Sequence, residues 1–196
     1  MTTISTFIST FRTDVARTNK FDVSIPVPSA LVSSGSWTGV SELLSFRCES
    51  AQLPSRSFST ANQRFGSNPI EQHPYHTDYN ESQMTFIVSG DMTEKYFFDA
   101  WMEAVNPSYT FDFTYKDTYV TDMTVYQYDT AGNLTYSTTF IDAYPKIVNQ
   151  LDLDWSTDSY HKLTVQFAYT SWINNIQKYN NSQLSSPTTT SQNSFY

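Results

Sequence analysis

His73 and His76 are the two residues whose type and spacing come nearest to a metal site in this sequence. Imidazole nitrogens bind Zn²⁺ well, but a structural zinc site needs about four protein ligands and a catalytic site about three. Pro74 lies between the two histidines, and neither a cysteine nor a further histidine occurs in the surrounding sequence. The pair is therefore interpreted as part of a solvated loop, and the sequence predicts no metal and no other cofactor.

Asp152 and Asp154 are the most suggestive pair of carboxylates, since two neighbouring acids can serve as general acid and general base. They alternate with Leu151 and Leu153, which is the pattern of a half-exposed strand or turn. No third group that would shift their pKa values can be identified in the sequence. This alternation therefore indicates structure rather than catalysis.

Serine, aspartate and histidine also occur together, as Ser156, Asp158, Ser159 and His161. A nucleophilic serine needs a sharp turn such as that of G-x-S-x-G, which is missing here, and residues of one local segment rarely reach the geometry of a triad. Cys48, the only cysteine, falls in the apolar phase of a predicted strand and is interpreted as a buried structural thiol. We therefore expect no catalytic residues and no disulfide within the chain.

The composition favours a mainly β protein. Aromatic residues make up 16% of the 196 residues and charged residues only 15%, and the abundant Tyr, Phe and Thr favour strands. The net charge is −8, and because phosphate binding requires Lys and Arg, tight binding to DNA or to an anionic membrane is excluded. An acidic wall would instead let a nucleic acid pass without being held. No secretory signal and no membrane-spanning apolar run is recognisable.

Alternation of apolar and polar residues predicts a series of strands, and helical spacing predicts two helices. A long helix begins at a capping box formed by Asp91 and Glu94, presents Phe97 and Trp101 on one face, and ends at Pro107. A short amphipathic helix is expected over residues 3–16 and a loop over residues 26–40. The predicted strands cover residues 16–25, 42–52, 82–89, 109–116, 120–128, 134–142 and 160–172, with a turn at residues 129–133.

Two segments depart from this regular pattern. Residues 54–80 alternate only weakly and are too long for an idle loop in a compact domain, so they are interpreted as a protruding hairpin or lasso that contacts a partner. After Asn180 the chain has no charged residue, and Ser, Thr, Asn and Gln dominate, so that it cannot bury enough apolar area to order itself. We therefore expect one β domain over residues 1–178 and a flexible polar tail over residues 179–196.

Three blocks of sequence, in this order, resemble the tail tube proteins of contractile-tailed bacteriophages of the T-even type. The first, residues 16–23, enters a strand; the second, residues 46–54, is a strand that breaks at Leu-Pro; and the third runs from residue 144 through the acidic-aliphatic segment to residue 172. Trp155 and Phe167 are expected in the core of the subunit. The core and motif positions in these blocks are Phe21, Phe46, Tyr144, Pro145, Leu151, Leu153, Trp155, Phe167 and Trp172.

The resemblance implies an antiparallel β-sandwich or partial barrel with one flanking helix and a short N-terminal helix. It also implies hexameric rings whose inner sheets join around a channel and which stack into a tube. The partners would then be further copies of the chain, the tail sheath, the baseplate and the tube terminator, with DNA passing through an acidic lumen without specific binding. The protein would belong to the tail of a virion assembled in the bacterial cytoplasm.

By the same resemblance, the segment at residues 54–80 would reach a neighbouring subunit or the next ring. The expected interface residues there are Leu53, Pro54, Arg56, Arg64 and Tyr75. No residue is expected to bind a cofactor.

Other functions stay open. The same fold could form the inner tube of a secretion system or of another contractile particle, or a tube initiator at the baseplate, although an initiator would be expected to have an extra domain. A carbohydrate-binding β-sandwich would use Tyr126, Tyr128 and Tyr136 to stack sugar rings. Cross-strand aromatic pairing and subunit contact explain these three tyrosines better.

Overall fold

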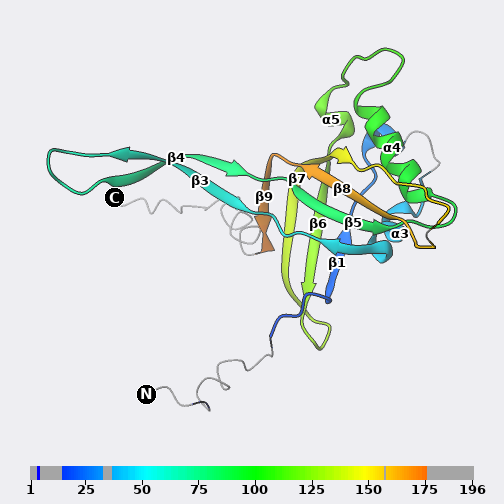
Figure 1. The fold of residues 1–196 in the computed structure, drawn as a ribbon, viewed down its shortest axis with the longest axis horizontal. Coiled ribbons are helices and arrows are strands. Elements are labelled where there is room, and N and C mark those ends of the chain that lie inside the picture. Colours follow the sequence, from blue (N-terminus) through cyan, green and yellow to red (C-terminus); the bar gives the residue numbers. More distant parts are fainter. Residues whose placement is uncertain (1–3, 5–14, 33–36, 157, 176–196) are drawn as a thin grey trace, which may run out of the picture.

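The computed structural model describes residue 4 and residues 15–32, 37–156 and 158–175 (Figure 1). Most of the helix expected at residues 3–16 and the whole tail expected at residues 179–196 lie outside the described residues. None of the described helices is long and apolar enough to cross a membrane. In chain order the elements are β1 (Phe21–Ser24), α2 (Ser29–Val32), α3 (Val40–Arg47), β2 (Cys48–Ala51), β3 (Arg56–Gln63), β4 (Glu71–Tyr79), β5 (Ser82–Ile87), α4 (Thr93–Val105), α5 (Lys116–Tyr119), β6 (Thr121–Tyr128), β7 (Leu134–Val148), β8 (Lys162–Ala168) and β9 (Ser171–Asn174).

Antiparallel pairing joins the strands in the order β1-β6-β7-β8-β5-β2, and β9 also pairs with β7. The first half of β7 pairs with β6 and β9, where Phe140 lies opposite Trp172. Its second half pairs with β8, where Pro145 lies opposite Phe167. Asp142, at a positive φ of 54°, lies between the two halves and bends the strand so that it serves both parts of the sheet. The antiparallel, mainly β fold expected from the sequence is confirmed.

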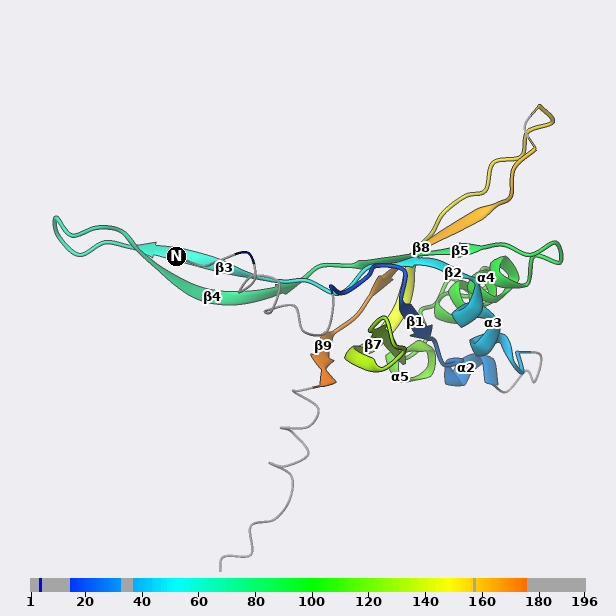
Figure 2. The same ribbon diagram turned by 90° about the horizontal axis from the view of Figure 1, so that it is seen from below.

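The core lies between the sheet and α4, which covers the β5–β8 part of it together with α3 (Figure 2). Phe86 on β5 and Phe167 on β8 are fully buried, as their alternation predicts. The ring of Phe98 on α4 packs against both, with centroid separations of 5.3 Å to Phe86 and 6.0 Å to Phe167. Trp101 is also buried and donates its indole N–H to the Tyr119 carbonyl oxygen at 2.7 Å. Each such burial stabilises the fold by about 1.5–3 kcal/mol.

Helix α4 confirms the predicted long helix, but its first turn differs from the expected capping box. The residue before the helix is Met92, in the left-handed conformation with φ of 56°, and no side chain caps it. Asp91 accepts hydrogen bonds from the hydroxyl groups of Ser89 and Thr93 instead. Glu94 is buried, and its carboxylate accepts a hydrogen bond from the Ser89 backbone N–H at 3.0 Å. The Asp91 and Glu94 side chains therefore stabilise the turn that leads into α4 through these hydrogen bonds.

Residues 42–47 form part of a helix where the alternation predicted a strand. Helix α3 ends at Arg47, and only the second half of the expected strand at residues 42–52 is extended, as β2. Leu44 is fully buried, whereas Phe46, expected in the core, is 86% exposed. Residues i and i+2 share one face of a strand but lie about 200° apart around a helix, so Leu44 and Phe46 cannot both face the core.

The aromatic alternation at residues 109–116 also does not form a strand. This segment folds back on the end of α4, where the Thr114 backbone N–H donates to the Val105 carbonyl oxygen at 3.1 Å, and it then enters α5. Phe111 adopts a positive φ of 58°, and Tyr109 and Phe113 are exposed. A strand pattern is stabilised only by a pairing strand, and none pairs with this segment in the described part of the chain. The loop expected at residues 26–40 likewise contains a short helix, α2.

The hairpin of β6 and β7 confirms the turn expected at residues 129–133. The Asp129 carboxylate accepts a hydrogen bond from the Asn133 backbone N–H at 2.8 Å, and Gly132 supplies the positive φ of 89° that the turn requires. The last predicted strand, at residues 160–172, is instead two strands, because β8 ends at Ala168 and β9 begins at Ser171 on the other half of β7.

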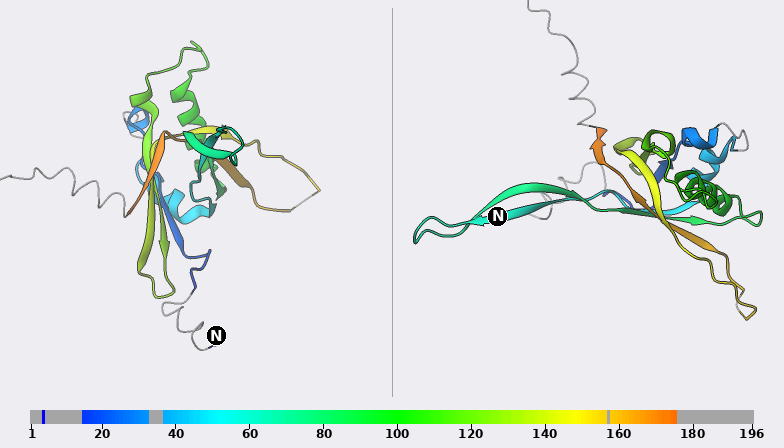
Figure 3. Two further views of the ribbon diagram at one scale, coloured as in Figure 1. Left: turned by 90° about the vertical axis from the view of Figure 1, so that its left-hand side faces the viewer. Right: turned by 90° about the horizontal axis from the view of Figure 1, so that it is seen from above.

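Two segments project from different sides of the molecule (Figures 1 and 2). Strands β3 and β4 form a separate two-stranded ribbon that extends from the body on one side, which confirms the protruding hairpin predicted for residues 54–80. On the other side, the connection between β7 and β8 forms a long loop, whose described residues, 149–156 and 158–161, contain neither helix nor strand. Figure 3 shows from above that the ribbon and the loop point away from each other.

Candidate assembly surfaces

The fold does not gather the side chains that the sequence offered for metal binding. His73 and His76 both lie on β4 and are exposed. The Nε2 atom of His73 is 3.5 Å from a carboxylate oxygen of Glu71, and that of His76 is 3.2 Å from one of Asp78. Across the residues that the structure describes, no group of three or more His, Cys, Asp or Glu side chains is arranged to hold a metal ion.

The candidate nucleophiles are engaged in structural contacts. The Ser156 hydroxyl donates to the Asp154 carboxylate at 2.6 Å. Cys48 is half-buried, and burial raises the pKa of its thiol to about 12, so that the thiol stays protonated at neutral pH. Its Sγ donates to the Ser50 carbonyl oxygen at 3.4 Å. These contacts support the structural interpretation of both residues.

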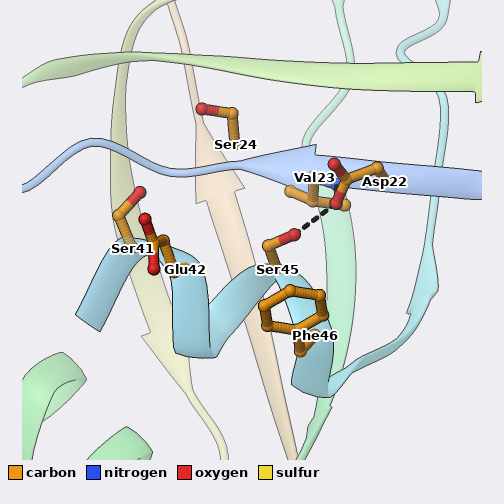
Figure 4. A pocket seen from close by; sticks show the side chains of 7 residues that line it. All are labelled: Asp22, Val23, Ser24, Ser41, Glu42, Ser45 and Phe46. Atoms are coloured by element: carbon orange, nitrogen blue, oxygen red, sulfur yellow. Dashed lines mark hydrogen bonds between the residues drawn. The ribbon is translucent and has the colours of Figure 1, made fainter. Parts of the chain in front are cut away.

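A groove of about 440 Å³ separates α3 from β1 (Figure 4). Its lining includes Asp22, Ser41, Glu42, Ser45 and Phe46, and the Ser45 hydroxyl donates to the Asp22 carboxylate. The lining combines carboxylates with hydroxyl groups but contributes no imidazole, amine or thiol. The Ser45–Asp22 hydrogen bond joins the helix to the strand, so the groove is best explained as a structural seam.

Arg56, one of the expected interface residues, is engaged within the chain at the base of the ribbon. Its Cζ lies 5.6 Å from the ring centroid of Phe58 and 5.6 Å from that of Trp172 on β9. Such cation–π contacts hold the start of β3 against β9. Beside it, Pro54 is half-buried and Leu53 is exposed. This end of the ribbon is therefore attached to the body rather than free to swing.

Hydrogen bonds also fix the direction in which the ribbon leaves the body. The Asn80 side-chain amide donates to the Ser55 hydroxyl at 3.0 Å, and Tyr169 on the sheet donates its hydroxyl to the Asn80 carbonyl oxygen. Within the ribbon, the Ser59 hydroxyl donates to the Asp78 carboxylate at 2.7 Å. These hydrogen bonds therefore set the direction of the ribbon within the single subunit.

The ribbon exposes several large apolar side chains along its length. Tyr75 and Arg64, both expected at an interface, are exposed, with Tyr75 at 72%. Phe58, Phe65 and Ile70 are also exposed and were not among the expected interface residues, although their occurrence in an otherwise polar segment was a usable signal. A two-stranded hairpin without a core is at best marginally stable in water, and clustered exposed apolar groups mark interaction sites. The assignment of this ribbon to an interface remains a prediction.

The loop at residues 149–161 corrects the expectation for two motif residues. Trp155 and Leu153, expected in the core, are fully exposed and 86% exposed, respectively. Leu151, nearer to β7, is half-buried against the core. The loop projects away from the sheet and the helices, so its outer side chains cannot pack against the core. The acidic residues Asp152 and Asp154 flank the tip of the loop.

The remaining motif residues lie in or beside the core. Phe167 is fully buried and Pro145 is buried, so these two core assignments agree with the structure. Phe21 is half-buried and packs against the core from β1. Tyr144 is half-buried, with its ring centroid 5.4 Å from that of Tyr119, and Trp172 is half-buried on β9.

The side of the sheet that faces away from the core carries two cross-strand pairs of threonine hydroxyl groups. The hydroxyl oxygens of Thr85 and Thr164 lie 3.3 Å apart across β5 and β8. Those of Thr124 and Thr139 lie 3.1 Å apart across β6 and β7. Threonine pairs of this kind stabilise neighbouring strands and add no charge to the surface.

Two lysines near this surface are neutralised by ion pairs. Lys162 on β8 lies 2.6 Å from the Glu49 carboxylate on β2, and Lys146 on β7 pairs with Glu81. Both pairs are substantially exposed, and such pairs contribute little to stability. Their consequence here is electrostatic, because they reduce the positive charge available to a phosphate backbone.

The tyrosines considered as a sugar-binding platform do not form an exposed aromatic face. Tyr126, Tyr128 and Tyr136 are all half-buried on β6 and β7. Their strands pair with each other, with Tyr136 opposite Gln127, and β1 covers the other edge of β6. This placement favours cross-strand packing as their role.

Comparison with known proteins identifies the family of this chain and shows which solved structures have a similar fold. The sequence matches a family model described as phage tail tube protein over residues 16–175. A search of curated proteins gave no significant match.

Similar folds occur in solved structures of contractile assemblies. One belongs to the sheath/tube terminator of an extracellular contractile injection system, PVC, in the extended state (TM-score 0.58, 14% identity, 82% of this chain and 96% of that chain). Others belong to the baseplate of the anti-feeding prophage (TM-score 0.59, 14% identity, 82% and 95%) and to its tube-terminating cap (TM-score 0.59, 13% identity, 82% and 90%). At these identities the likeness is one of fold.

Proposed function

Because the chain belongs to the phage tail tube protein family, we propose that it is a structural subunit that polymerises into the tube of a contractile phage tail. The family consists of structural proteins rather than enzymes. The tube would be built from stacked, hexameric rings of this chain. Its partners would be further copies, the surrounding sheath, the baseplate and the tube terminator, and its place would be the tail of a virion assembled in the host cytoplasm.

The observation that carries this proposal is the isolated ribbon of β3 and β4. It is held at its base by Arg56 and Asn80, and it exposes apolar side chains along its length. A ribbon with this geometry gains stability by packing on another molecule. In a tube it would reach a neighbouring subunit or the next ring, with Leu53, Pro54, Arg56, Arg64 and Tyr75 in or near the contact.

Ring closure would use the ends of the main sheet. β1 and β2 are the terminal strands in the pairing order, and in the described chain β9 pairs with β7 alone. The outer edges of these strands offer backbone N–H and C=O groups to another copy. Joining such edges around a ring would produce one continuous barrel and remove the free edges.

The side of the sheet lined by threonine pairs would face the channel. Its neutral hydroxyl groups, the paired lysines and the chain's net charge of −8 offer little attraction to phosphates. DNA would therefore slide through the lumen without being bound specifically. The acidic character of the channel itself remains part of this proposal.

Negative-stain electron microscopy of the purified chain tests the proposal directly. Stacked rings or hollow filaments on concentration would support the tube subunit. A monomer at every salt concentration, together with saturable binding on a glycan array, would contradict it in favour of a carbohydrate-binding module.

A tube subunit of a contractile injection particle is the second candidate, favoured by the fold similarity to chains from such particles. The genomic neighbourhood separates the two. A sheath gene accompanied by capsid genes indicates a phage, whereas a sheath gene without capsid genes indicates an injection particle. A tube initiator at the baseplate would be present in far fewer copies per particle than a tube subunit, which quantitative mass spectrometry of purified particles would reveal.

A further inference from the structure

The two projecting ends of this molecule have complementary chemistry. We propose that the turn of the ribbon, residues 64–70, docks on the tip of the β7–β8 loop, residues 152–155, of another copy of the chain. The proposal rests on the proposed function and deepens it, because it names the two surfaces that would join successive subunits. The occupant of each surface is a second copy.

The first support is the placement of the two segments. The ribbon and the loop leave the body on different sides and diverge from each other (Figures 2 and 3). A contact between two different surfaces of one chain is heterologous, and repetition of such a contact generates rings or filaments rather than a closed dimer. This geometry is the one that a polymerising subunit requires.

The second support is the apolar surface on both sides. In the turn, Phe65 is 71% exposed and Ile70 is 59% exposed. In the loop, Leu153 is 86% exposed and Trp155 is fully exposed. A large aromatic side chain at the end of a projecting loop is costly to leave in water, and Trp and Arg are the residues most enriched at the energetic centres of interfaces.

The third support is charge. Arg64 is the only charged residue between Gln63 and Glu71, so the turn is locally positive. The β7–β8 loop carries Asp152, Asp154 and Asp158 and no Lys or Arg, so it is locally negative. A guanidinium that reaches this loop would find carboxylates and the face of the Trp155 indole, both of which favour Arg.

The other described cations make poorer partners for the loop, because most are already paired within the chain. The ion pairs are Arg47–Glu94, Lys95–Asp99, Lys116–Asp142, Lys146–Glu81 and Lys162–Glu49, and Arg56 lies over the Phe58 and Trp172 rings. Arg64 stands at the far end of the ribbon, where a neighbouring molecule can reach it.

Single substitutions give the first test. Trp155→Ala and Arg64→Glu should each raise the protein concentration needed for assembly by about thirtyfold or more, the loss typical of a central interface residue. Tyr115→Ala is the matched control, since Tyr115 is 88% exposed but lies on neither surface. All three variants should keep the thermal midpoint of the wild-type monomer. Assembly of Trp155→Ala at the wild-type concentration would overturn the pairing.

Mixing the defective variants gives the sharper test. Each variant retains one of the two surfaces, so Trp155→Ala, which keeps the turn, and Arg64→Glu, which keeps the loop, should associate with each other through that single contact more strongly than either variant associates with itself. Light scattering coupled to size-exclusion chromatography would detect it. Two monomers that do not associate would count against the pairing.

A charge exchange completes the design. Combining Arg64→Glu with Asp152→Arg in one chain should restore tubes that Arg64→Glu alone does not form, and failure to restore them would contradict the charge argument. The wild type separates the two proposals. Tubes from the wild type and equally from Trp155→Ala would overturn only the pairing, whereas a wild type that never assembles would count against both.

Discussion

Arg47, the last residue of α3, forms an ion pair with Glu94 in the first turn of α4, and the Glu94 side chain is only 1% exposed. The same carboxylate accepts hydrogen bonds from the Ser89 backbone N–H at 3.0 Å and from the Ser89 hydroxyl at 2.9 Å. One buried acid therefore joins three segments: the end of α3, the start of α4 and the turn that follows β5.

Removing this carboxylate should destabilise the subunit. Glu94→Ala would leave Arg47 and the Ser89 N–H without their buried acceptor, so the free energy of unfolding should fall by about 2–4 kcal/mol. Urea denaturation of the monomer measures it. Glu42→Ala, an exposed acid on α3, is the control and should change the value by less than about 0.5 kcal/mol. Equal effects of the two substitutions would show that Glu94 has no special role.

Glu94 should also make stability depend on pH. Burial opposes its ionisation, but the hydrogen bonds from Ser89 and Arg47 outweigh burial, and the pKa of Glu94 lies below its ordinary 4.5. A carboxyl group whose pKa is lower in the folded state stabilises the fold above the unfolded pKa, and this contribution is lost as the pH falls through the folded pKa.

The comparison with Glu94→Gln isolates that contribution. Between about pH 5 and pH 3 the wild type should lose more stability than the variant, as measured by thermal unfolding at each pH. Asp91, whose pKa is lowered to about 2 mainly by the Ser89 hydroxyl, is present in both proteins and cancels. Parallel pH profiles would rule out the assigned shift at Glu94.

Phe167→Ala should lower the stability of the monomer, whereas Trp155→Ala should leave it unchanged. Phe167→Ala removes a fully buried ring that packs against Phe98, so it should cost about 3–5 kcal/mol of stability. Trp155→Ala removes a fully exposed ring and should leave the denaturation midpoint of the monomer unchanged. A large loss of stability in Trp155→Ala would mean that the ring packs within its own subunit.

Deleting residues 58–78 should leave a folded protein that cannot build long tubes. The ribbon forms its own two-stranded sheet and shares no strand with the main sheet, so its loss removes no core residue. Circular dichroism and thermal unfolding would check the fold, and electron microscopy would check assembly. Long tubes from the shortened chain would exclude the ribbon from the subunit contact.

Positive charge placed on the side of the sheet that carries the threonine pairs should make assembled tubes bind DNA. Thr85→Lys combined with Thr164→Lys would add two cations per subunit to the proposed channel wall, repeated around each ring. Assembled variant tubes should then retain short DNA duplexes at low salt and release them at high salt, unlike wild-type tubes. The same substitutions on Thr118 and Thr130, which are exposed away from these strand pairs, serve as a control.

The alternation of apolar and polar residues predicted a strand correctly where the strand pairs with another strand that buries the same face. The alternation in β5 and β8 correctly identified Phe86 and Phe167 as buried, because the two strands pair in register and share one inner face. The turn at residues 129–133 was predictable because Asp129 and Gly132 satisfy its geometry locally. The protruding ribbon was predictable from its length and weak pattern alone.

Alternation did not predict a strand correctly where the described chain offers no strand to pair with it. Residues 42–47 alternate like a strand, yet they form α3 because only Leu44 of that pattern has a core to enter. Among the described strands none pairs with the aromatic run at residues 109–116, which turns back on α4. The Arg47–Glu94 ion pair joins residues far apart in the sequence, so it could not be predicted from the residues around either one.

The β-rich character, the acidic balance, most of the strands and the family resemblance could all be recognised from the residues alone. Which apolar side chains are buried became known only from the folded chain. Trp155 and Phe167 are both aromatic residues in segments where apolar and polar residues alternate, but Trp155 lies on a projecting loop and Phe167 lies under α4. Burial depends on atoms contributed by distant parts of the chain, so it appears only once the chain has folded.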